Sequence, residues 1–356
     1  MKRIKIGSTF VGQSDKPYFI ADIGSNHDGD LDRAIKLIEL AKEAGANAAK
    51  FQNFKAAKIV SNKGFDSLRG RLSHQSSWKK PVVEVYKDAS IPFTWTKIIK
   101  EKCDEVGIEY FTSAYDFESV DQVNPFVNVF KIGSGDITWI EILKHIAKKG
   151  KPILISSGAS DMKDIVRAMN TLEQYTDDIV LMQCNTNYTT SPENFKNINL
   201  KVLNTFRQRF PNIVLGLSDH TLGHVTVLGA IALGANVIEK HFTDDNNRNG
   251  PDHKFSMSPL LWREMVDRAN ELFLALGDGI KRVEENEKQT TIVQRRSLRY
   301  AKDISEGEVL AKEDLIALRP VIEGSVPPYD IDEIIGGKIK KNVLKDDTVF
   351  RKDLKL

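Results

Sequence analysis

The chain has 356 residues, 41% hydrophobic and 28% charged, so it is long enough to bury a full core and to form more than one domain. Its 51 Lys and Arg residues nearly balance its 49 Asp and Glu residues, and the net charge of +2 argues against binding to nucleic acid or to an anionic membrane. It has two cysteines, no apolar signal segment at its N-terminus and no apolar run near the ~20 residues that cross a bilayer, which together predict a soluble cytoplasmic protein.

Short β-rich runs alternate with longer helical patterns through most of the chain. Amphipathic stretches such as LDRAIKLIELAKEAG separate the runs, and several end at a glycine suited to a left-handed helix terminus: Gly45, Gly107 and Gly150. The runs themselves predict eight strands: Tyr18–Gly24, Ala48–Phe54, Ile108–Ala114, Val129–Ser134, Pro152–Gly158, Ile179–Cys184, Val214–His220 and Val237–Phe242. Eight strand-then-helix units predict a (β/α)₈ TIM barrel over residues 1–281.

A doubly wound open sheet shows the same alternation of strands and helices. Its usual nucleotide-binding turn, G-x-G-x-x-G, is missing, because the first strand leads into GSNHDGD. Beyond the barrel, residues 282–294 are polar and charged and predict a linker. Residues 295–356 contain short strands and turn signals, which predict a small β-rich domain close to the lower size limit for an independent core.

Polar and charged residues stand at the carboxyl end of almost every predicted strand. In a barrel these ends and the loops after them carry catalytic groups, whereas the body of a strand buried on both faces is expected to be apolar. A single polar residue at such a position can be a satisfied core group. Eight strand ends with the same character indicate a functional rim.

His220 and His241 end the seventh and eighth predicted strands, which are neighbours in a closed barrel. Two imidazoles with carboxylates and water make a nitrogen and oxygen site suited to Mn²⁺, with Mg²⁺ or Co²⁺ as alternatives. Hydrogen bonding within the rim is the competing interpretation of each histidine. The sequence offers no Cys or third His at tetrahedral spacing, which argues against a structural zinc site.

Two lysines, Lys50 and Lys131, are expected to point into the same mouth, and a buried ammonium needs a partner. Hydroxyl groups expected nearby can surround phosphate oxygens, although loop capping explains most single serines: Thr112, Ser134, Ser156 and Ser218. The G-x-x-x-x-G-K-[ST] loop is missing from the sequence, which disfavours hydrolysis of nucleoside triphosphates. Five carboxylates are candidates for orienting sugar hydroxyls or acting as a general base: Asp22, Asp136, Asp219, Glu239 and Asp252.

The same segments resemble, in order and spacing, the barrel motifs of the sialic acid synthase family. The matching segments are ADIGSNHDG, AAKFQNFKA, FKIGSGD, LGLSDHT, IEKHFTDD and NGPDHKFSM. The C-terminal RRSLRYAKDISEGEVLAKEDLIALRP is similar to the antifreeze-like (SAF) domain of that family. The resemblance covers nearly the whole chain.

This resemblance implies condensation of phosphoenolpyruvate with N-acetylmannosamine or a related amino-hexose, giving a nine-carbon 2-keto-3-deoxy acid and phosphate. It implies that His220 and His241 bind the metal. It also implies that the carboxylate of Asp22 or Asp136 acts on the reaction intermediate or the sugar. It also implies a domain-swapped homodimer in which Arg319 serves the partner's site. The implied phosphoenolpyruvate contacts are Lys50, Thr112, Lys131, Ser134, Ser156 and Ser218, and the implied sugar contacts are Gln52, Tyr188 and Asp252.

Several positions depart from the family pattern. Asp22 and Asp136 stand where glutamate is usual, Gln183 where histidine is common and Thr189 where proline is, and FTSAYDFES replaces the usual S-T-P-F-D. These departures predict an acceptor other than plain N-acetylmannosamine. Candidates are an N-acylated or diamino-hexose of the legionaminic or pseudaminic precursor type, or mannose itself.

Three other functions compete with this hypothesis. A phosphoenolpyruvate-dependent synthase of a shorter keto acid would need extra cations for a phosphorylated pentose or tetrose. An aldolase would form a Schiff base on a lysine such as Lys131 or Lys240. A carbohydrate- or ice-binding role of the C-terminal domain is the weakest alternative, because it does not explain the charged rim of the barrel.

Overall fold

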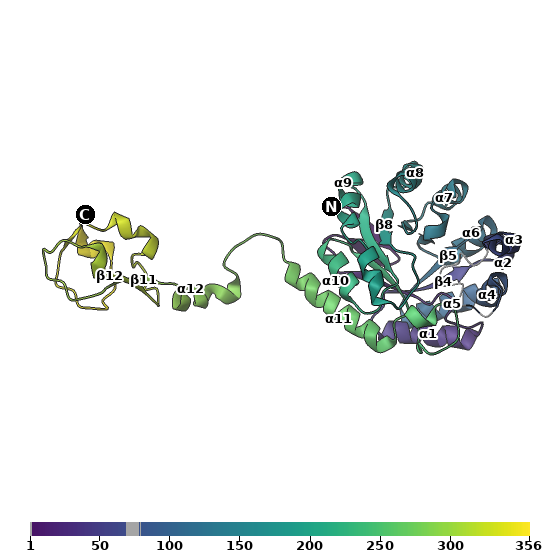
Figure 1. The fold of residues 1–356 in the computed structure, drawn as a ribbon, viewed down its shortest axis with the longest axis horizontal. Coiled ribbons are helices and arrows are strands. Elements are labelled where there is room, and N and C mark those ends of the chain that lie inside the picture. Colours follow the sequence, from purple (N-terminus) through teal and green to yellow (C-terminus); the bar gives the residue numbers. More distant parts are fainter. Residues whose placement is uncertain (1, 69–77, 79) are drawn as a thin grey trace. The chain divides into compact units, whose positions relative to one another are not determined.

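The structure is a computed structural model and describes residues 2–68, 78 and 80–356. The chain divides into two compact units, Met1–Gly277 and Asp278–Leu356 (Figure 1). The predicted linker, residues 282–294, falls within the second unit, where Lys288–Gln294 forms the short helix α12. Within the described ranges, no helix is both long enough and apolar enough to cross a membrane.

The first unit is built on a closed barrel of parallel strands. The last barrel strand pairs with the first one, with His241 opposite Asp22 in the register. This closure excludes the open doubly wound sheet and confirms the predicted (β/α)₈ barrel. The barrel strands are β3 (Tyr18–Asp22), β4 (Ala48–Asn53), β5 (Glu109–Ala114), β6 (Phe130–Ile132), β7 (Ile153–Ser156), β8 (Ile179–Cys184), β9 (Val214–Asp219) and β10 (Val237–His241).

Helices surround the barrel (Figure 1). Gly45, Gly107 and Gly150 adopt positive φ angles of 93°, 70° and 69° after helices α1, α5 and α7, which confirms the predicted left-handed termini. The helices of this unit are α1 (Leu31–Glu43), α2 (Ala56–Ile59), α3 (Asn62–Ser67), α4 (Val82–Ala89), α5 (Phe93–Val106), α6 (Phe117–Val123), α7 (Ile140–Ala147), α8 (Met162–Leu172), α9 (Val202–Arg209), α10 (Val225–Ala232) and α11 (Pro259–Leu276).

Most of the predicted strands are longer than the observed ones at the carboxyl end. The predicted strand Val129–Ser134 shortens to Phe130–Ile132, because Ser134–Asp136 forms a 3-10 turn instead. The predicted strand Val214–His220 likewise ends at Asp219. The polar residues at these positions therefore stand at the rim and in its loops.

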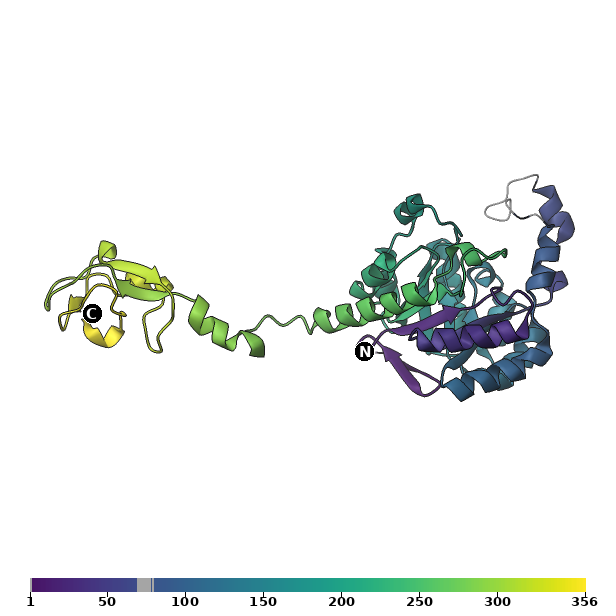
Figure 2. The same ribbon diagram turned by 90° about the horizontal axis from the view of Figure 1, so that it is seen from below.

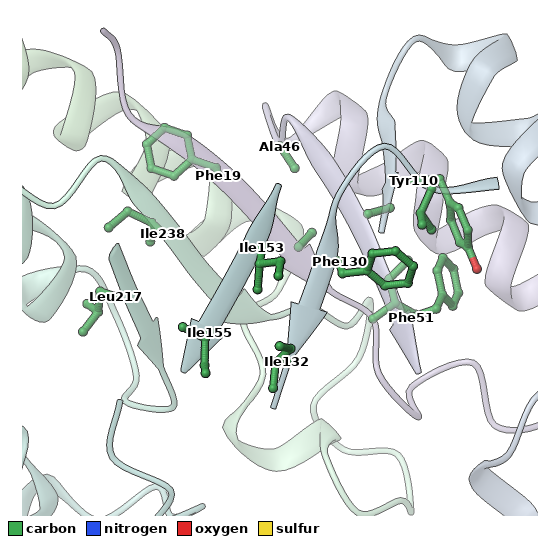
Figure 3. Close-up of a cluster of buried hydrophobic side chains, with 14 of the residues drawn as sticks. Phe19, Ala46, Phe51, Tyr110, Phe130, Ile132, Ile153, Ile155, Leu217 and Ile238 are labelled. Atoms are coloured by element: carbon green, nitrogen blue, oxygen red, sulfur yellow. The ribbon is translucent and has the colours of Figure 1, made fainter. Parts of the chain in front are cut away.

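Side chains alternate between the two faces of each strand. The outward-facing side chains pack against the helices in one large cluster that includes Phe51, Leu217 and Ile238, which Figure 3 shows on the barrel strands. The inward-facing residues near the amino ends of the strands form a second cluster, which includes Ile20, Phe111 and Val237. The interior is therefore filled by apolar side chains at one end of the barrel, and its polar residues are concentrated at the other.

An N-terminal hairpin, which the sequence analysis did not predict, closes the amino end of the barrel. It consists of β1 (Arg3–Ile6) and β2 (Thr9–Gly12), the purple pair of strands beside the N-terminus in Figure 2. Ile4, Ile6 and Val11 are at most 1% exposed and belong to the inner cluster. The hairpin therefore keeps water from that end of the interior.

Truncating the hairpin core is expected to destabilise the barrel. Ile6→Ala should lower the free energy of unfolding by about 2–5 kcal/mol, because it leaves a cavity under the strands. Phe10→Ala is the matched control: Phe10 lies on the same hairpin but is 48% exposed, so its loss should cost less than about 1 kcal/mol. Urea unfolding followed by tryptophan fluorescence measures both values, and equal losses would show that the hairpin does not plug the barrel.

The second unit has a small core of its own. It contains the antiparallel pairs β11 (Ser297–Tyr300) with β12 (Leu315–Leu318) and β13 (Lys338–Ile339) with β14 (Leu354–Lys355). Buried side chains such as Leu298, Tyr300 and Val349 form a cluster separate from those of the barrel. The β-rich character matches what the sequence predicts for residues 295–356.

Candidate active site

Polar side chains fill the inner face of the barrel at the carboxyl ends of the strands. On each strand they lie on the same inward face as the apolar residues of the inner cluster, but nearer the carboxyl end. Most of those on the strands are buried, at most 7% exposed: Asp22, Lys50, Ser113, Lys131, Ser156, Ser218, Glu239 and His241, with His220 directly after β9. We call this set, with the loops above it, the mouth.

The first lysine of the mouth forms a buried ion pair. Lys50 Nζ lies 2.7 Å from Asp22 Oδ2, and the two side chains are 3% and 4% exposed. Burial alone would lower the pKa of Lys50, but Asp22 and Glu239 outweigh it and raise that pKa above its ordinary value. Lys50 is therefore an ammonium group at neutral pH.

The second lysine pairs with a carboxylate across the barrel. Lys131 Nζ lies 3.2 Å from Glu239 Oε1, which also accepts a hydrogen bond of 3.1 Å from Ser218 Oγ. Burial would raise the pKa of Glu239, but Lys131 and then Lys50 overcome this and lower it to about 2. The mouth thus holds two ammonium groups, each paired with a carboxylate.

Several atoms of the mouth still lack a hydrogen-bond partner within the described residues. The strands of the mouth carry five such buried polar atoms: Asp22 Oδ1, Ser113 Oγ, Ser156 Oγ, Glu239 Oε2 and His241 Nδ1. Nearly all buried polar groups in proteins are hydrogen bonded. Five such atoms at one end of a barrel indicate that a polar ligand completes the site.

The two predicted metal ligands lie side by side. The rings of His220 and His241 are 5.4 Å apart between centroids, and His220 Nδ1 donates a 2.9 Å hydrogen bond to the carbonyl of Asn185. Burial, and then the neighbouring His241, lower the pKa of His220 to about 4. This neutral imidazole is held so that its Nε2 lone pair is available to a cation, which is a common support for a metal-binding histidine.

The described residues contain no group of three His, Cys, Asp or Glu side chains arranged as a metal site. Two adjacent imidazoles fit a divalent cation that takes its other ligands from water and substrate, as an open catalytic site does. The unpartnered Nδ1 of His241 is consistent with that chemistry. The donor set therefore suits a cation such as Mn²⁺ better than a closed zinc site.

Two of the predicted sugar contacts lie beside these histidines. The ring of Tyr188 is 4.4 Å from that of His220, and the Asp252 carboxylate is 3.9 Å from His241 Nδ1. Asp252 also accepts a 2.7 Å hydrogen bond from Ser25 Oγ. Gln52 follows Lys50 by two residues on β4 and so shares its inward face.

The 3-10 turn after β6 carries Ser134 and Asp136. Ser134 Oγ accepts a 3.0 Å hydrogen bond from the backbone N–H of Gly158. Burial raises the pKa of Asp136 to about 6, although the charge of Lys131 opposes this shift. Asp136 is therefore a carboxyl group that changes protonation close to neutral pH, as a general base requires.

Thr112 is not in the mouth, which corrects its predicted role in binding phosphoenolpyruvate. Its hydroxyl points to the outer side of β5, where it donates a 2.6 Å hydrogen bond to Asn53 Oδ1. The prediction is off by one residue in a strand whose side chains alternate between the inner and outer faces. Ser113 is the residue that faces inward, and it stands opposite Lys131 in the strand register. Ser113 therefore takes the place that was predicted for Thr112.

Two further polar residues at strand ends also face outward. Asp219 forms a buried ion pair with Lys240 on the helix side of β9 and β10, and Thr226 Oγ1 donates to the same carboxylate at 2.6 Å. Gln183 donates a 2.9 Å hydrogen bond to the carbonyl of Ile198. Neither Asp219 nor Gln183 is in a position to touch a substrate in the mouth, because each is on the far side of its strand.

Arg319 lies in the second unit, directly after β12, and is exposed. Its expected role, which is to complete the site in the barrel of a partner subunit, stays a prediction. By contrast, Glu239 was only one of several candidate carboxylates in the sequence analysis, and the structure places it at the centre of the mouth. A period of two counted back from His241 would have indicated this inward position.

Comparison with known proteins places the chain in a family. The model of the NeuB family matches residues 37–281, and that of the SAF domain matches residues 295–355. The chain belongs to the NeuB family. It is therefore a relative of enzymes that synthesise sugar acids, and its C-terminal unit is an SAF domain.

Individual relatives of this NeuB-family chain cover nearly its whole length. It is 35% identical to the N,N'-diacetyllegionaminic acid synthase of Campylobacter jejuni, over 94% of this chain and 99% of the relative. It is 31% identical to the human N-acetylneuraminate-9-phosphate synthase, over 96% and 93%. The crystal structure of an N-acetylneuraminic acid synthetase from Leptospira borgpetersenii matches 81% of this chain and 95% of that chain, with a TM-score of 0.71 and 26% identity.

Proposed function

We propose that this protein is a nonulosonic acid synthase that joins phosphoenolpyruvate to an acylamino-hexose and releases phosphate. The observation that carries the proposal is the mouth itself, where two buried lysines and two adjacent imidazoles meet at one end of a closed barrel. Membership in the NeuB family supports the reaction class. The product would be a nine-carbon 2-keto-3-deoxy acid.

Lys50 and Lys131 would hold the phosphate and carboxylate of phosphoenolpyruvate. Each ammonium is already paired with a carboxylate, so it remains charged inside the barrel while retaining donors for the ligand. Hydroxyl groups of the mouth would complete the contacts to the phosphate: Ser113, Ser134, Ser156 and Ser218. This assignment replaces Thr112 with Ser113.

His220 and His241 would hold the divalent cation, Mn²⁺ in the first instance, with Mg²⁺ and Co²⁺ as alternatives. When bound, the cation supplies Lewis acidity to the aldehyde oxygen of the sugar. The aldehyde would be oriented by Gln52, Tyr188 and Asp252. Of these side chains, Tyr188 packs against His220 and Asp252 lies near His241, so the sugar end of the mouth is next to the imidazoles.

The reaction forms one carbon–carbon bond and breaks one carbon–oxygen bond. C3 of phosphoenolpyruvate attacks C1 of the aldose, whose carbonyl oxygen takes up a proton. Water adds to C2 and loses one proton to a carboxylate, which leaves a hydroxyl and a phosphate on the same carbon. The bond from C2 to the phosphate oxygen then breaks, the remaining hydroxyl proton passes to the departing phosphate, and the keto acid and phosphate are left. Asp136 is the preferred base because its pKa is raised to about 6, and Asp22 is the alternative.

A Schiff-base aldolase fits the lysines less well. Such an enzyme needs a lysine whose amine can lose its proton and reach a carbonyl group. Lys131 is paired with Glu239 inside the barrel, and Lys240 is paired with Asp219 on its outer side. Neither lysine is therefore a free amine in the mouth.

The acceptor is proposed to be an N-acylated or diamino-hexose rather than plain N-acetylmannosamine. Asp22 and Asp136 both lie at the mouth, where an aspartate side chain, one methylene shorter than the family's usual glutamate, reaches less far toward a substrate. Gln183, which also departs from the family pattern, lies outside the mouth. Phosphate release can be measured with phosphoenolpyruvate, Mn²⁺ and a panel of legionaminic-type, pseudaminic-type and plain N-acetylated aldoses, and mannose. A strong preference for N-acetylmannosamine would overturn this choice of acceptor, and no phosphate release with any aldose would overturn the proposed function.

The active assembly is proposed to be a domain-swapped homodimer in which Arg319 completes the partner's site. If so, mixing inactive Arg319→Ala chains with inactive Lys50→Met chains should restore activity, because a mixed dimer contains one mouth with both groups intact. Light scattering after size-exclusion chromatography gives the oligomeric state. A monomer that is fully active would contradict the proposal.

The activity is expected to depend on pH through Asp136. As a base Asp136 must be ionised, so kcat/KM should fall as the pH drops below about 6, where its carboxyl group becomes protonated. Asp136→Asn should lower kcat by about 10²–10⁴-fold and remove this limb of the profile. An unchanged limb in Asp136→Asn would assign the base to another group, with Asp22 as the next candidate.

A further inference from the structure

Buried contacts that the proposed reaction does not use join the loops after β3 and β10. Asn26, which is fully buried in the first loop, donates hydrogen bonds of 2.9 Å to the carbonyl of Phe242 and to Ser256 Oγ in the second. The second loop carries Asp252, the proposed sugar contact. The relative position of the two loops therefore bears on the shape of the mouth.

His253 is a fully buried polar group of this junction. Its side chain is 0% exposed, and both ring nitrogens are engaged: Nε2 lies 2.9 Å from Asp28 Oδ1, and Nδ1 lies 2.8 Å from Thr243 Oγ1. Asp28 belongs to the first loop and Thr243 to the second. The ring therefore connects both loops and has no position left for a substrate.

The acidic partner of His253 is an ionised carboxylate. Burial would raise the pKa of Asp28, but hydrogen bonds from His253 and then Arg248 leave it below its ordinary value. Arg248 Nε lies 2.7 Å from Asp28 Oδ2, and Arg33 Nε lies 3.2 Å from the same oxygen. A carboxylate can only accept, so His253 Nε2 carries the proton of this bond.

The residue before His253 is fixed by the same arrangement. Asp252 accepts hydrogen bonds of 2.7 Å from Ser25 Oγ and 3.3 Å from the Ser25 backbone N–H, which ties its carboxylate to the first loop. The backbone of Gly250 lies so close to the His253 ring that a Cβ there would be 2.6 Å from Cδ2. The loop that presents Asp252 therefore rests directly on the imidazole.

We propose that His253, held by Asp28, is a positioning residue that sets the Asp252 carboxylate at the sugar end of the mouth. Asp28, Thr243 and His253 form what we call the loop clamp. The inference rests on the proposed function, because it takes Asp252 as a sugar contact. It extends that function by assigning specificity for the aldose to residues that never touch it.

The first test is the kinetics of His253→Asn. Asparagine cannot span both partners, so the KM for the aldose should rise by about tenfold, which corresponds to the loss of roughly one or two hydrogen bonds, while the KM for phosphoenolpyruvate stays within about twofold. The matched control is His145→Asn, which breaks a surface His–Asp pair with Asp121 at 2.7 Å, remote from the mouth, and should change neither constant. Equal increases in both KM values for His253→Asn would overturn the proposal.

A double-mutant cycle separates positioning from general destabilisation. If His253 acts through Asp252, the variant His253→Asn combined with Asp252→Asn should have the same KM for the aldose as Asp252→Asn alone, within about twofold. Multiplication of the two single effects would show that His253 acts independently. Should His253→Asn fail to fold, Asp28→Asn serves in its place, because it keeps the shape of the pair and removes only its charge.

Hydrogen exchange tests the clamp even if the proposed reaction is wrong. Amides between residues 246 and 256 should exchange at least about fivefold faster in His253→Asn or Asp28→Asn than in the wild type, since the loop loses its support. Faster exchange in the variants, with no synthase activity in the wild type, would support the loop clamp and overturn the proposed function. Unchanged exchange in the variants would overturn the loop clamp, whether or not the wild type is active.

Discussion

Replacing His220 with alanine is expected to lower the affinity for Mn²⁺ by about 100-fold or more and kcat/KM by on the order of 10³-fold, which is roughly 4 kcal/mol of transition-state stabilisation. The reason is that only two protein side chains are proposed to hold the cation, so the loss of one leaves a single imidazole. His241→Ala should behave alike. Electron paramagnetic resonance of free Mn²⁺ measures the affinity directly, and phosphate release measures the rate.

The control for these variants is His145→Ala. His145 lies on α7, where it pairs with Asp121 at the surface, and its removal should leave both Mn²⁺ affinity and kcat/KM within about twofold, as for an ordinary surface change. Undiminished Mn²⁺ binding by His220→Ala and by His241→Ala would show that the cation is held elsewhere.

Replacing Lys131 with methionine is expected to lower the free energy of unfolding by about 3–5 kcal/mol, because it leaves the Glu239 carboxylate buried without its cation. The same change should reduce kcat/KM by more than about 10³-fold, since it also removes a proposed phosphate ligand. Urea unfolding and phosphate release measure the two effects separately.

In the double variant, the loss of stability is expected to be reversed while the loss of activity persists. Lys131→Met combined with Glu239→Gln removes both charges, so it should recover most of the lost stability while remaining inactive. Lys149→Met is the control for losing an exposed ion pair, here with Asp121, and should cost at most about 1 kcal/mol. A stable Lys131→Met variant would show that Glu239 is not an obligate partner of this lysine.

The pH dependence of stability follows from the same pair. The pKa of Glu239 in the folded protein is lowered to about 2, below its ordinary value of 4.5, so folding favours the ionised form. The stabilisation is therefore fully present above about pH 4.5 and is lost as the pH falls toward 2. In Lys131→Met this part of the acid sensitivity should disappear.

The barrel could be predicted from the sequence because its signals are local and repeated. Each strand run is bounded by turn residues, and glycines such as Gly107 mark helix ends by a conformation that other residues adopt at a cost. The N-terminal hairpin was missed because its two strands have four residues each, too few for a clear period, and their burial depends on the barrel above them. That contact is tertiary and leaves no local signal.

The candidate site was predictable in composition but not in orientation. The sequence correctly brings Lys50, Lys131 and the two histidines to one mouth, because strand ends of a closed barrel must meet. It does not say which of two adjacent residues faces inward: the prediction names Thr112, whereas Ser113 is the residue that faces the mouth. A shift of one residue reverses the face, so such errors follow from uncertainty in where a strand starts.

The partners of the charged groups were the least predictable feature. Lys131 forms an ion pair with Glu239 across the barrel interior, and Lys240 forms one with Asp219 on the outer side of the barrel. The two lysines nevertheless stand in similar sequence contexts near strand ends. The difference is set by the period of two and by the curvature of the sheet. The loop clamp is of the same kind, because Asp28 and His253 are far apart in the chain and adjacent in space.

The phosphorus-31 resonance of phosphoenolpyruvate tests most directly whether one mouth holds both the cation and the phosphorylated enol. With protein, phosphoenolpyruvate and Mn²⁺ together, we expect strong paramagnetic broadening of this resonance relative to the same sample with Mg²⁺, and loss of the broadening in His220→Ala while phosphoenolpyruvate still binds. A narrow resonance in the wild type, with both ligands shown to be bound, would rule out a shared site, because the cation and the phosphate would then lie far apart.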